Sequence, residues 1–266
     1  MAYDTGFAEV NGTRLYYEIQ GAGPALVLIH GNILDHRMWE DQFSHFAQRY
    51  SVLRYDARGF GRSALPPSAP YDHADDLRAL LRTLGTDHAA ILGLSMGGRI
   101  AVNFAIRYPE ATDALIAVDA GLDGYAFERP LLADVIAQAR CSGVDAARAV
   151  WQAHPLLAPA SQKPKVAKQL AEMTATYTGW HWLHADPQRS PSPAAIKRLA
   201  TIRAPTLIVV GERDLSDFHR IAEVLADGIP GAERVVLPGA GHFANMEAPT
   251  EFNNVVLSFL QRAFVN

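Results

Sequence analysis

Residues 89–98 read AAILGLSMGG, an apolar run that ends in the pattern Gly-x-Ser-x-Gly. A helical pattern of apolar and polar residues follows at 96–107. This order predicts a buried strand, a sharp turn that carries Ser95, and a helix packed on the strand. Gly93 and Gly97 suit such a turn because glycine has no Cβ atom to collide across it. A glycine-rich strand-to-helix turn with an incidental serine is the alternative interpretation.

Similar apolar runs on both sides of this stretch are typical of strands buried on both faces of a parallel sheet. They are ALVLIH (25–30), SVLRYD (51–56), ALIAVD (114–119), PTLIVVG (205–211) and RVVLP (234–238). Helical patterns lie between them at 37–48, 73–84, 217–227 and 249–263. Near the start, Asn11-Gly12 separates two short β-rich segments and predicts an antiparallel hairpin. The alternation predicts an α/β fold, with a doubly wound, mostly parallel sheet of about eight strands flanked by helices.

The alternation stops between Ala120 and about Ser192, where no strand pattern is found. Helical patterns and prolines fill this interval instead, with helices expected near 130–140, 144–153 and 163–176. We therefore predict a core of residues 1–120 and 193–266 and a helical cap, or lid, at 121–192. Ligands of such sheets bind at the carboxyl ends of the strands, so the cap is expected to cover the site. A helical subdomain on the far side is the alternative.

The composition is that of an ordinary globular protein, with 266 residues, 49% hydrophobic and 20% charged. A net charge of −4 without a basic cluster argues against binding to nucleic acid. The single cysteine, Cys141, excludes an intramolecular disulfide and a multi-cysteine zinc site. The N-terminus lacks the pattern of a secretory signal, and no apolar run approaches the roughly 20 residues of a membrane span. We expect a cytoplasmic monomer or homodimer that binds neither membranes nor nucleic acid.

Three residues with complementary chemistry each follow a predicted strand, namely Ser95, Asp214 and His242. A parallel sheet brings such positions together at one edge. A histidine beside a serine can take its proton as general base, and an aspartate on the other ring nitrogen fixes the tautomer. Asp119 ends the strand before the cap and is the alternative acid. Asp217 is expected to begin or cap a helix.

The same mechanism needs two N–H donors for the oxyanion that forms on the attacked carbonyl. The first expected donor is the backbone N–H of Met96, directly after Ser95. The second is the N–H of Asn32, which follows His30-Gly31 after a predicted strand. Asn32 as a simple turn former is the alternative, and His30 is expected to have a structural role.

Taken together, the motifs resemble those of the α/β-hydrolase family over nearly the whole chain. They are HGN (30–32), YDARGFGRS (55–63), GLSMGG (93–98), GERD (211–214) and GAGHFANMEAP (239–249). The resemblance implies that Ser95, Asp214 and His242 are nucleophile, acid and base, and that the loop around Asp56, Arg58 and Arg62 is structural. The serine nucleophile departs from haloalkane dehalogenases and epoxide hydrolases of this fold, which use aspartate.

The function that follows is hydrolysis of small or medium carboxylic esters or lactones through an acyl-enzyme, without a cofactor. Two alternatives stay open: an enol-lactone or C–C bond hydrolase of aromatic degradation, and a non-catalytic ligand-binding protein with the same fold. The residues expected to line the substrate pocket are Ile33, Tyr177, Trp180, Trp182 and Phe243. Packing of the cap onto the core is the alternative for the aromatic cluster of the cap, which is Tyr177, Trp180, His181, Trp182 and His184. A metal site at His181 and His184 is not expected, because no further ligand is evident beyond Asp186.

Overall fold

The computed structural model describes residues 3–264 and contains one eight-stranded sheet in the order β1-β2-β4-β3-β5-β6-β7-β8. The strands are β1 Asp4–Val10, β2 Thr13–Gln20, β3 Ala25–Ile29, β4 Ser51–Tyr55, β5 Ala89–Leu94, β6 Thr112–Val118, β7 Thr206–Gly211 and β8 Glu233–Leu237. All neighbouring strands from β4 to β8 run parallel, and only β1 and β2 are antiparallel to their neighbours. The predicted α/β class is therefore confirmed.

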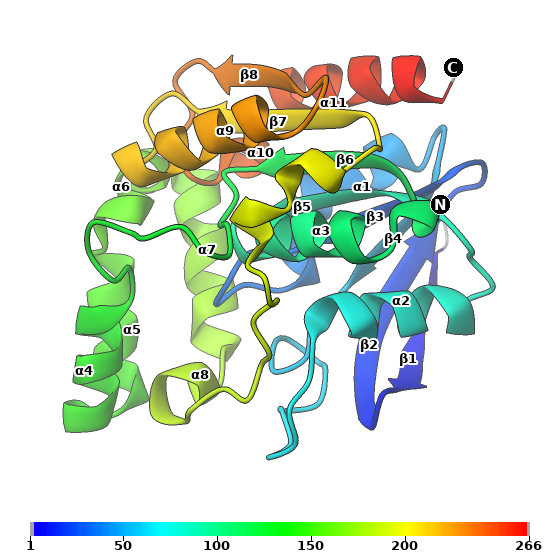
Figure 1. The fold of residues 1–266 in the computed structure, drawn as a ribbon. Coiled ribbons are helices and arrows are strands. Elements are labelled where there is room, and N and C mark those ends of the chain that lie inside the picture. The colour runs from blue at the N-terminus through cyan, green and yellow to red at the C-terminus, as the bar shows by residue number, and fades with distance from the viewer. Residues whose placement is uncertain (1–2, 265–266) are drawn as a thin grey trace.

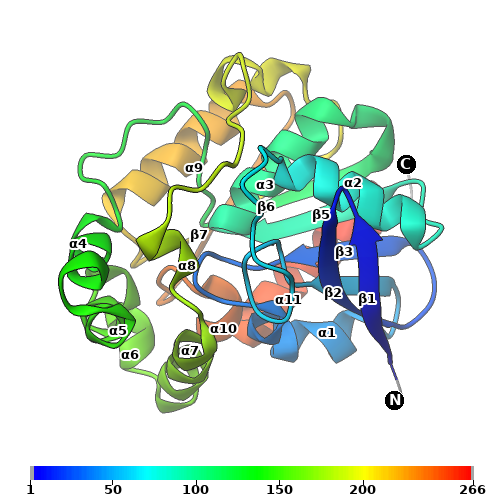
Figure 2. The ribbon, with the colours of Figure 1, turned by 90° about the horizontal axis from the view of Figure 1, so that it is seen from below.

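Helices cover both faces of this sheet (Figure 1). They are α1 Glu40–Phe46, α2 His73–Thr83, α3 Met96–Arg107, α9 Ser216–Gly228, α10 Ala244–Glu247 and α11 Pro249–Ala263. Figure 2 shows α2, α3 and α9 on one side and α1 and α11 on the other. The central strands β3, β5, β6 and β7 are almost wholly buried between these layers, which explains their unbroken apolar sequences.

The predicted hairpin forms between β1 and β2, where Val10 pairs with Thr13. Asn11 and Gly12 form the two-residue turn, with φ angles of 47° and 69°. Positive φ at both central residues is what a type I′ turn requires, and asparagine followed by glycine tolerates it best.

The turn between β5 and α3 is as tight as its glycines predict. A Cβ atom on Gly93 would lie 2.0 Å from the carbonyl oxygen of Gly97, and one on Gly97 would lie 2.1 Å from that of Ile29. Ser95, between them, has φ 58° and ψ −112°, which a residue with a side chain rarely adopts. The backbone thus holds Ser95 in a strained position at the end of the strand.

Five helices and no strand lie between β6 and the short 3-10 turns that precede β7. They are α4 Ala133–Ser142, α5 Val144–Gln152, α6 Ala158–Ser161, α7 Pro164–Thr176 and α8 Trp180–Leu183. In Figure 1 they stand beside the carboxyl ends of the parallel strands. Side-chain contacts join them to the rest of the chain, such as the bond from Arg37 Nη2 to Thr176 Oγ1 (2.7 Å). Among the helices within residues 3–264, none has the length and apolar character needed to cross a membrane.

Candidate active site

The sheet order brings the candidate residues to one edge of the molecule. Ser95 follows β5, Asp119 follows β6, Asp214 follows β7, and His242 lies in the loop after β8. These four strands are consecutive neighbours and run parallel, so their carboxyl ends lie side by side. Residues that are up to 147 positions apart along the chain (95 to 242) are thereby collected at one place.

His242 and Asp214 form a buried pair, with 2.8 Å between Nδ1 and Oδ2 and both side chains nearly inaccessible. A carboxylate only accepts hydrogen bonds, so Nδ1 carries the proton and Nε2 is the free acceptor. The ring of Phe218 lies 4.3 Å from the imidazole, and the N–H of Leu215 donates to the other Asp214 oxygen. These contacts fix the orientation of the imidazole. Ser95 and His242 line the same small cavity.

Asp119, the alternative acid, is buried beside this pair but is not bonded to the imidazole. Its Oδ1 accepts from the N–H of Gly211 at 2.8 Å, and its Oδ2 has no hydrogen-bond partner within residues 3–264. Burial, and after it the neighbouring carboxylate of Asp214, raises the pKa of Asp119 well above its ordinary value. Burial thus favours the protonated form of Asp119, and the carboxylate bonded to His242 is that of Asp214.

The two candidate oxyanion donors lie beside Ser95, because Asn32 and Met96 line the larger of two cavities that meet there. Asn32 sits in a turn closed by a bond from the N–H of Leu34 to the carbonyl of Gly31 (3.3 Å). Ile33, the third residue of that turn, has φ 69°, a position usually taken by glycine. Such a conformation costs about 1–3 kcal/mol in a residue with a side chain. The strained residue of this turn is thus the one that directly follows Asn32.

Glu247 holds the loop that carries His242, a role that sequence reasoning missed. Its two carboxylate oxygens accept from the N–H groups of Gly241 (2.9 Å) and Phe243 (3.1 Å), on either side of His242. Glu247 is itself buried, at 5% exposed. An acidic residue five positions after His242, within GAGHFANMEAP, was the available signal.

His30 is committed to backbone contacts, as expected for a structural residue. Its Nε2 accepts from the N–H of Ala57 at 2.9 Å, so Nδ1 carries the proton and lies 2.8 Å from the carbonyl oxygen of Gly31. Burial lowers the pKa of His30. The neutral ring joins the loop after β3 to the loop after β4.

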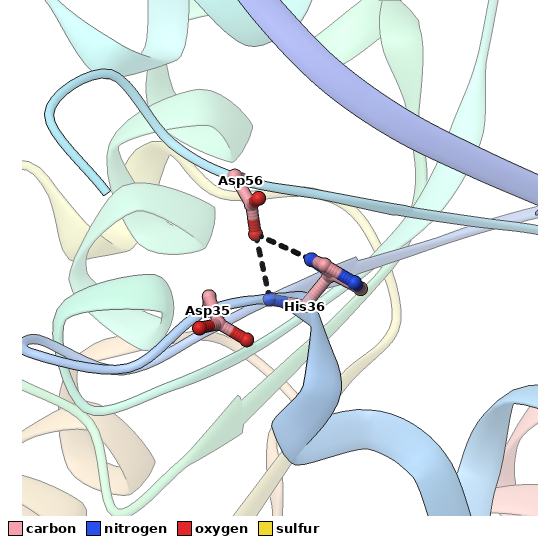
Figure 3. A group of neighbouring side chains, drawn as sticks. All are labelled: Asp35, His36 and Asp56. Atoms are coloured by element: carbon pink, nitrogen blue, oxygen red, sulfur yellow. Dashed lines mark hydrogen bonds and ion pairs between the residues drawn. The ribbon is translucent and has the colours of Figure 1, made fainter. Parts of the chain in front are cut away.

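A second group, Asp35, His36 and Asp56, is drawn in Figure 3 and has ligand atoms within 4.8 Å of one another. Asp56 Oδ1 accepts from both the N–H and the ring Nδ1 of His36, each at 2.8 Å, and Oδ2 accepts from the N–H of Arg62. Asp35 forms a bidentate pair with Arg37, at 2.8 and 2.6 Å. Since these contacts occupy all four carboxylate oxygens, the group anchors loops, and we assign no metal to it. Asp119, Asp214 and His242 also lie this close together, and their contacts are those described above.

The residues proposed for the pocket divide into two groups. Ile33 and Phe243 line the small cavity beside Ser95. Within residues 3–264, neither cavity at Ser95 is lined by Tyr177, Trp180 or Trp182, so their assignment to the pocket is corrected.

The reason is packing among the helices of segment 121–192. Trp182 is fully buried, with its ring 5.0 Å from that of Tyr177. The Tyr177 hydroxyl bonds the Nδ1 of His181 (2.9 Å), while Trp180 stacks on His184. The residues that do line the larger cavity, and that sequence reasoning missed, include Arg99, Leu131, Leu132 and Phe218.

Comparison with known proteins identifies the family of the chain. The family model of the alpha/beta hydrolase fold matches residues 24–249, and the chain belongs to that family. Among solved structures, an enol-lactonase from Burkholderia xenovorans LB400 is 26% identical, with a TM-score of 0.81 and coverage of 96% of this chain and 100% of that one. Est816, described as an N-acyl homoserine lactone degrading enzyme, is 30% identical, with a TM-score of 0.79 and the same coverage. Carboxylesterase YbfK of Bacillus subtilis is 26% identical over 89% of this chain and 80% of its own length.

Proposed function

We propose that this alpha/beta hydrolase is a serine hydrolase that cleaves carboxylic esters, lactones included, through an acyl-enzyme. The observation that carries the proposal is the buried Asp214–His242 bond of 2.8 Å beside a cavity that Ser95 also lines. The esterase and lactonase names of the relatives support the same reaction class.

In the first half of the reaction, the Ser95 Oγ attacks the ester carbonyl carbon while His242 Nε2 takes the hydroxyl proton. The carbonyl oxygen becomes an oxyanion, which accepts hydrogen bonds from the N–H groups of Asn32 and Met96. Each such donor typically lowers the barrier by about 3 kcal/mol. The carbon–oxygen bond then breaks, and the leaving alkoxide takes the proton from His242. In the second half, water repeats these steps on the acyl-enzyme and releases the acid and free Ser95.

A fluorophosphonate probe tests the nucleophile directly. We expect intact-mass analysis to show one adduct, mapped by peptide sequencing to Ser95 and lost in Ser95→Ala. Ser258→Ala, which alters an exposed serine on α11, is the matched control and should label normally. Labelling at another residue, or none at all, would contradict the proposal. A protein that retains a small ligand tightly and hydrolyses neither esters nor lactones would instead be a binding protein.

A further inference from the structure

Two cavities of very different size meet at Ser95. The larger holds about 450 Å³ and the smaller about 30 Å³. Both are lined by Ser95 and Asn32, so a carbonyl group at Ser95 would have one substituent in each. The small cavity has about one fifteenth of the volume of the large one. It therefore suits the shorter of the two substituents.

Most of the wall of the small cavity is apolar, and four of its large apolar side chains are buried. Ile33, Trp151, Leu156 and Phe243 are each between 1% and 3% exposed. Trp151 also stacks on His154, with ring centroids 5.4 Å apart. A longer alkyl chain would have to displace these side chains, which is unfavourable in packed surroundings.

The position of His242 indicates which half of an ester enters which cavity. His242 lines the small cavity, while the described lining of the large cavity does not include it. In the proposed function, on which this step rests, His242 returns its proton to the leaving oxygen. A general acid must be within hydrogen-bond reach of the atom it protonates. The alcohol half therefore lies toward the small cavity and the acyl half in the large one.

The large cavity carries a cluster of polar groups around Arg99, one helical turn after Ser95. Arg99 Nη1 donates to Asp123 Oδ1 at 3.3 Å, and Nη2 donates to Gln188 Oε1 at 3.1 Å. His73 and Asp186 line the same cavity. The acyl half thus meets hydrogen-bond donors and acceptors in addition to the apolar wall.

The charges in this cluster argue against an anionic acyl group. Arg99 supplies one positive charge, against two negative charges from Asp123 and Asp186. His73 and His181, which both line this cavity, add no positive charge at neutral pH. Burial lowers the pKa of His73 well below its ordinary value and that of His181 to about 4. A substrate carboxylate would therefore meet a net negative charge and be repelled. Hydroxyl, keto or amide groups, by contrast, find both hydrogen-bond donors and acceptors in this cluster.

We propose that the substrates are esters of a small alcohol, methyl or ethyl, whose medium-sized acyl group carries a neutral hydrogen-bonding group selected by Arg99. In this assignment Arg99 is a specificity residue for the acyl half. Leu156, in the wall of the small cavity, limits the length of the alcohol.

Two matched ester series test both halves. The first compares methyl, ethyl and butyl hexanoate, and kcat/KM should fall at least about tenfold from methyl to butyl, the equivalent of about 1.4 kcal/mol. The second compares methyl 6-hydroxyhexanoate, methyl hexanoate and monomethyl adipate, in that expected order of kcat/KM. Equal or better cleavage of butyl hexanoate, or of the adipate carboxylate, would overturn the proposal. These comparisons use the unmodified protein and do not depend on whether a variant folds.

Two variants then separate the cavities. Leu156→Ala should reduce severalfold the methyl-to-butyl ratio, which is kcat/KM for methyl hexanoate divided by that for butyl hexanoate. It should leave unchanged the hydroxyl-to-alkyl ratio, which is kcat/KM for methyl 6-hydroxyhexanoate divided by that for methyl hexanoate. Arg99→Met should reduce the hydroxyl-to-alkyl ratio about tenfold, the order expected for loss of a hydrogen bond to a charged group, and leave the methyl-to-butyl ratio unchanged. Arg82→Gln, at an exposed arginine of α2, should change neither ratio. Either ratio responding to the wrong variant would overturn the assignment of the cavities.

Labelling and ester cleavage together distinguish a failure of the cavity assignment from a failure of the proposed serine hydrolase function. Fluorophosphonate labelling of Ser95 with cleavage of esters in the reverse order contradicts the cavity assignment alone. Absence of both labelling and cleavage contradicts the serine hydrolase itself.

Discussion

Two buried carboxyl groups stand at the ends of β6 and β7, and their environments differ. Asp214 is bonded to His242, while burial and the nearby Asp214 carboxylate raise the pKa of Asp119. The groups that face Asp119 are the Asp214 carboxylate, the His242 imidazole and the backbone N–H groups of Gly211 and Ala244. The two N–H groups favour the ionised form of Asp119, but burial and the Asp214 carboxylate oppose it more strongly and raise the pKa.

Substituting asparagine for Asp214 and, separately, for Asp119 distinguishes the partner of His242 from the neighbouring carboxyl group. Asp214→Asn should lower kcat/KM by about 10⁴, as the corresponding change does in another Ser-His-Asp enzyme. Asp119→Asn should keep kcat/KM within about threefold and leave the pH profile unmoved, because an amide resembles a neutral acid. The measurement is kcat/KM between pH 5 and 9 for both variants. If Asp119 were ionised, its loss would shift the acid limb of the profile to lower pH.

His181 makes a different contribution, to the pH dependence of stability. Its pKa is lowered to about 4, first by burial, whereas an unfolded chain has an ordinary histidine pKa of about 6.5. Between these values the unfolded state binds the proton and the folded state does not, so the free energy of unfolding decreases as pH falls from 6.5 to 4. His181→Phe keeps a ring against Phe60 and removes the titration. Its melting temperature should therefore fall less over this pH range than that of the unmodified protein, and a parallel fall would contradict this explanation.

At the scale of elements, the loop from β8 to α10 depends on Glu247. Glu247→Ala leaves the N–H groups of Gly241 and Phe243 without partners, at about 1–3 kcal/mol for each buried donor. We expect a lower melting temperature and a lower kcat/KM, since the same loop positions His242. Glu251→Ala, at an exposed glutamate on α11, is the control for both measurements. Unchanged activity in Glu247→Ala would show that the loop keeps its shape without the two hydrogen bonds to Glu247.

The elements that could be predicted from the sequence are those with strong local signals. Apolar runs predicted six strands within two residues of their observed ends, and Asn11-Gly12 predicted the hairpin. The predicted helix at 37–48 is instead a 3-10 turn, His36–Trp39, followed by α1, because the Asp35 side chain accepts from the N–H of Arg37 and fixes the first turn.

The polar lining of the site was not predictable in the same way. Arg99 follows a helical pattern and looks like a solvent-facing residue in the sequence. Its place in the cavity depends on Asp123 and Gln188, which lie 24 and 89 residues away along the chain. Likewise, Trp180 and Trp182 have the composition of a pocket lining, but local packing directs them elsewhere. Side chains gathered by long-range packing leave no periodic signal in the sequence.

At the scale of the whole molecule, Phe60 joins the sheet to the segment 121–192. Its ring stacks on His181 at 4.4 Å and on Tyr177 at 5.8 Å, and meets the edge of His30 at 5.3 Å. Phe60→Ala should cost about 3–5 kcal/mol, as for other buried phenylalanines. Limited proteolysis should then cleave first within 121–192, while hydrogen exchange in β5 and β6 changes less. Phe7→Ala, at an exposed phenylalanine of the hairpin, should show neither effect. Faster cleavage elsewhere in Phe60→Ala would contradict this role.

The backbone conformation of Ser95 lowers the stability of the fold. Glycine adopts φ 58° and ψ −112° freely, whereas a residue with a Cβ atom is strained there by about 1–3 kcal/mol. Ser95→Gly should therefore melt at a higher temperature than Ser95→Ala, although both lack the hydroxyl, and equal melting temperatures would show that the turn stores no strain. If selection for catalytic activity were relaxed, a serine-to-glycine change at position 95 would give a more stable protein that lacks the hydroxyl. Under the proposed function, the fold keeps the Ser95 hydroxyl at a cost in stability that glycine at position 95 would avoid.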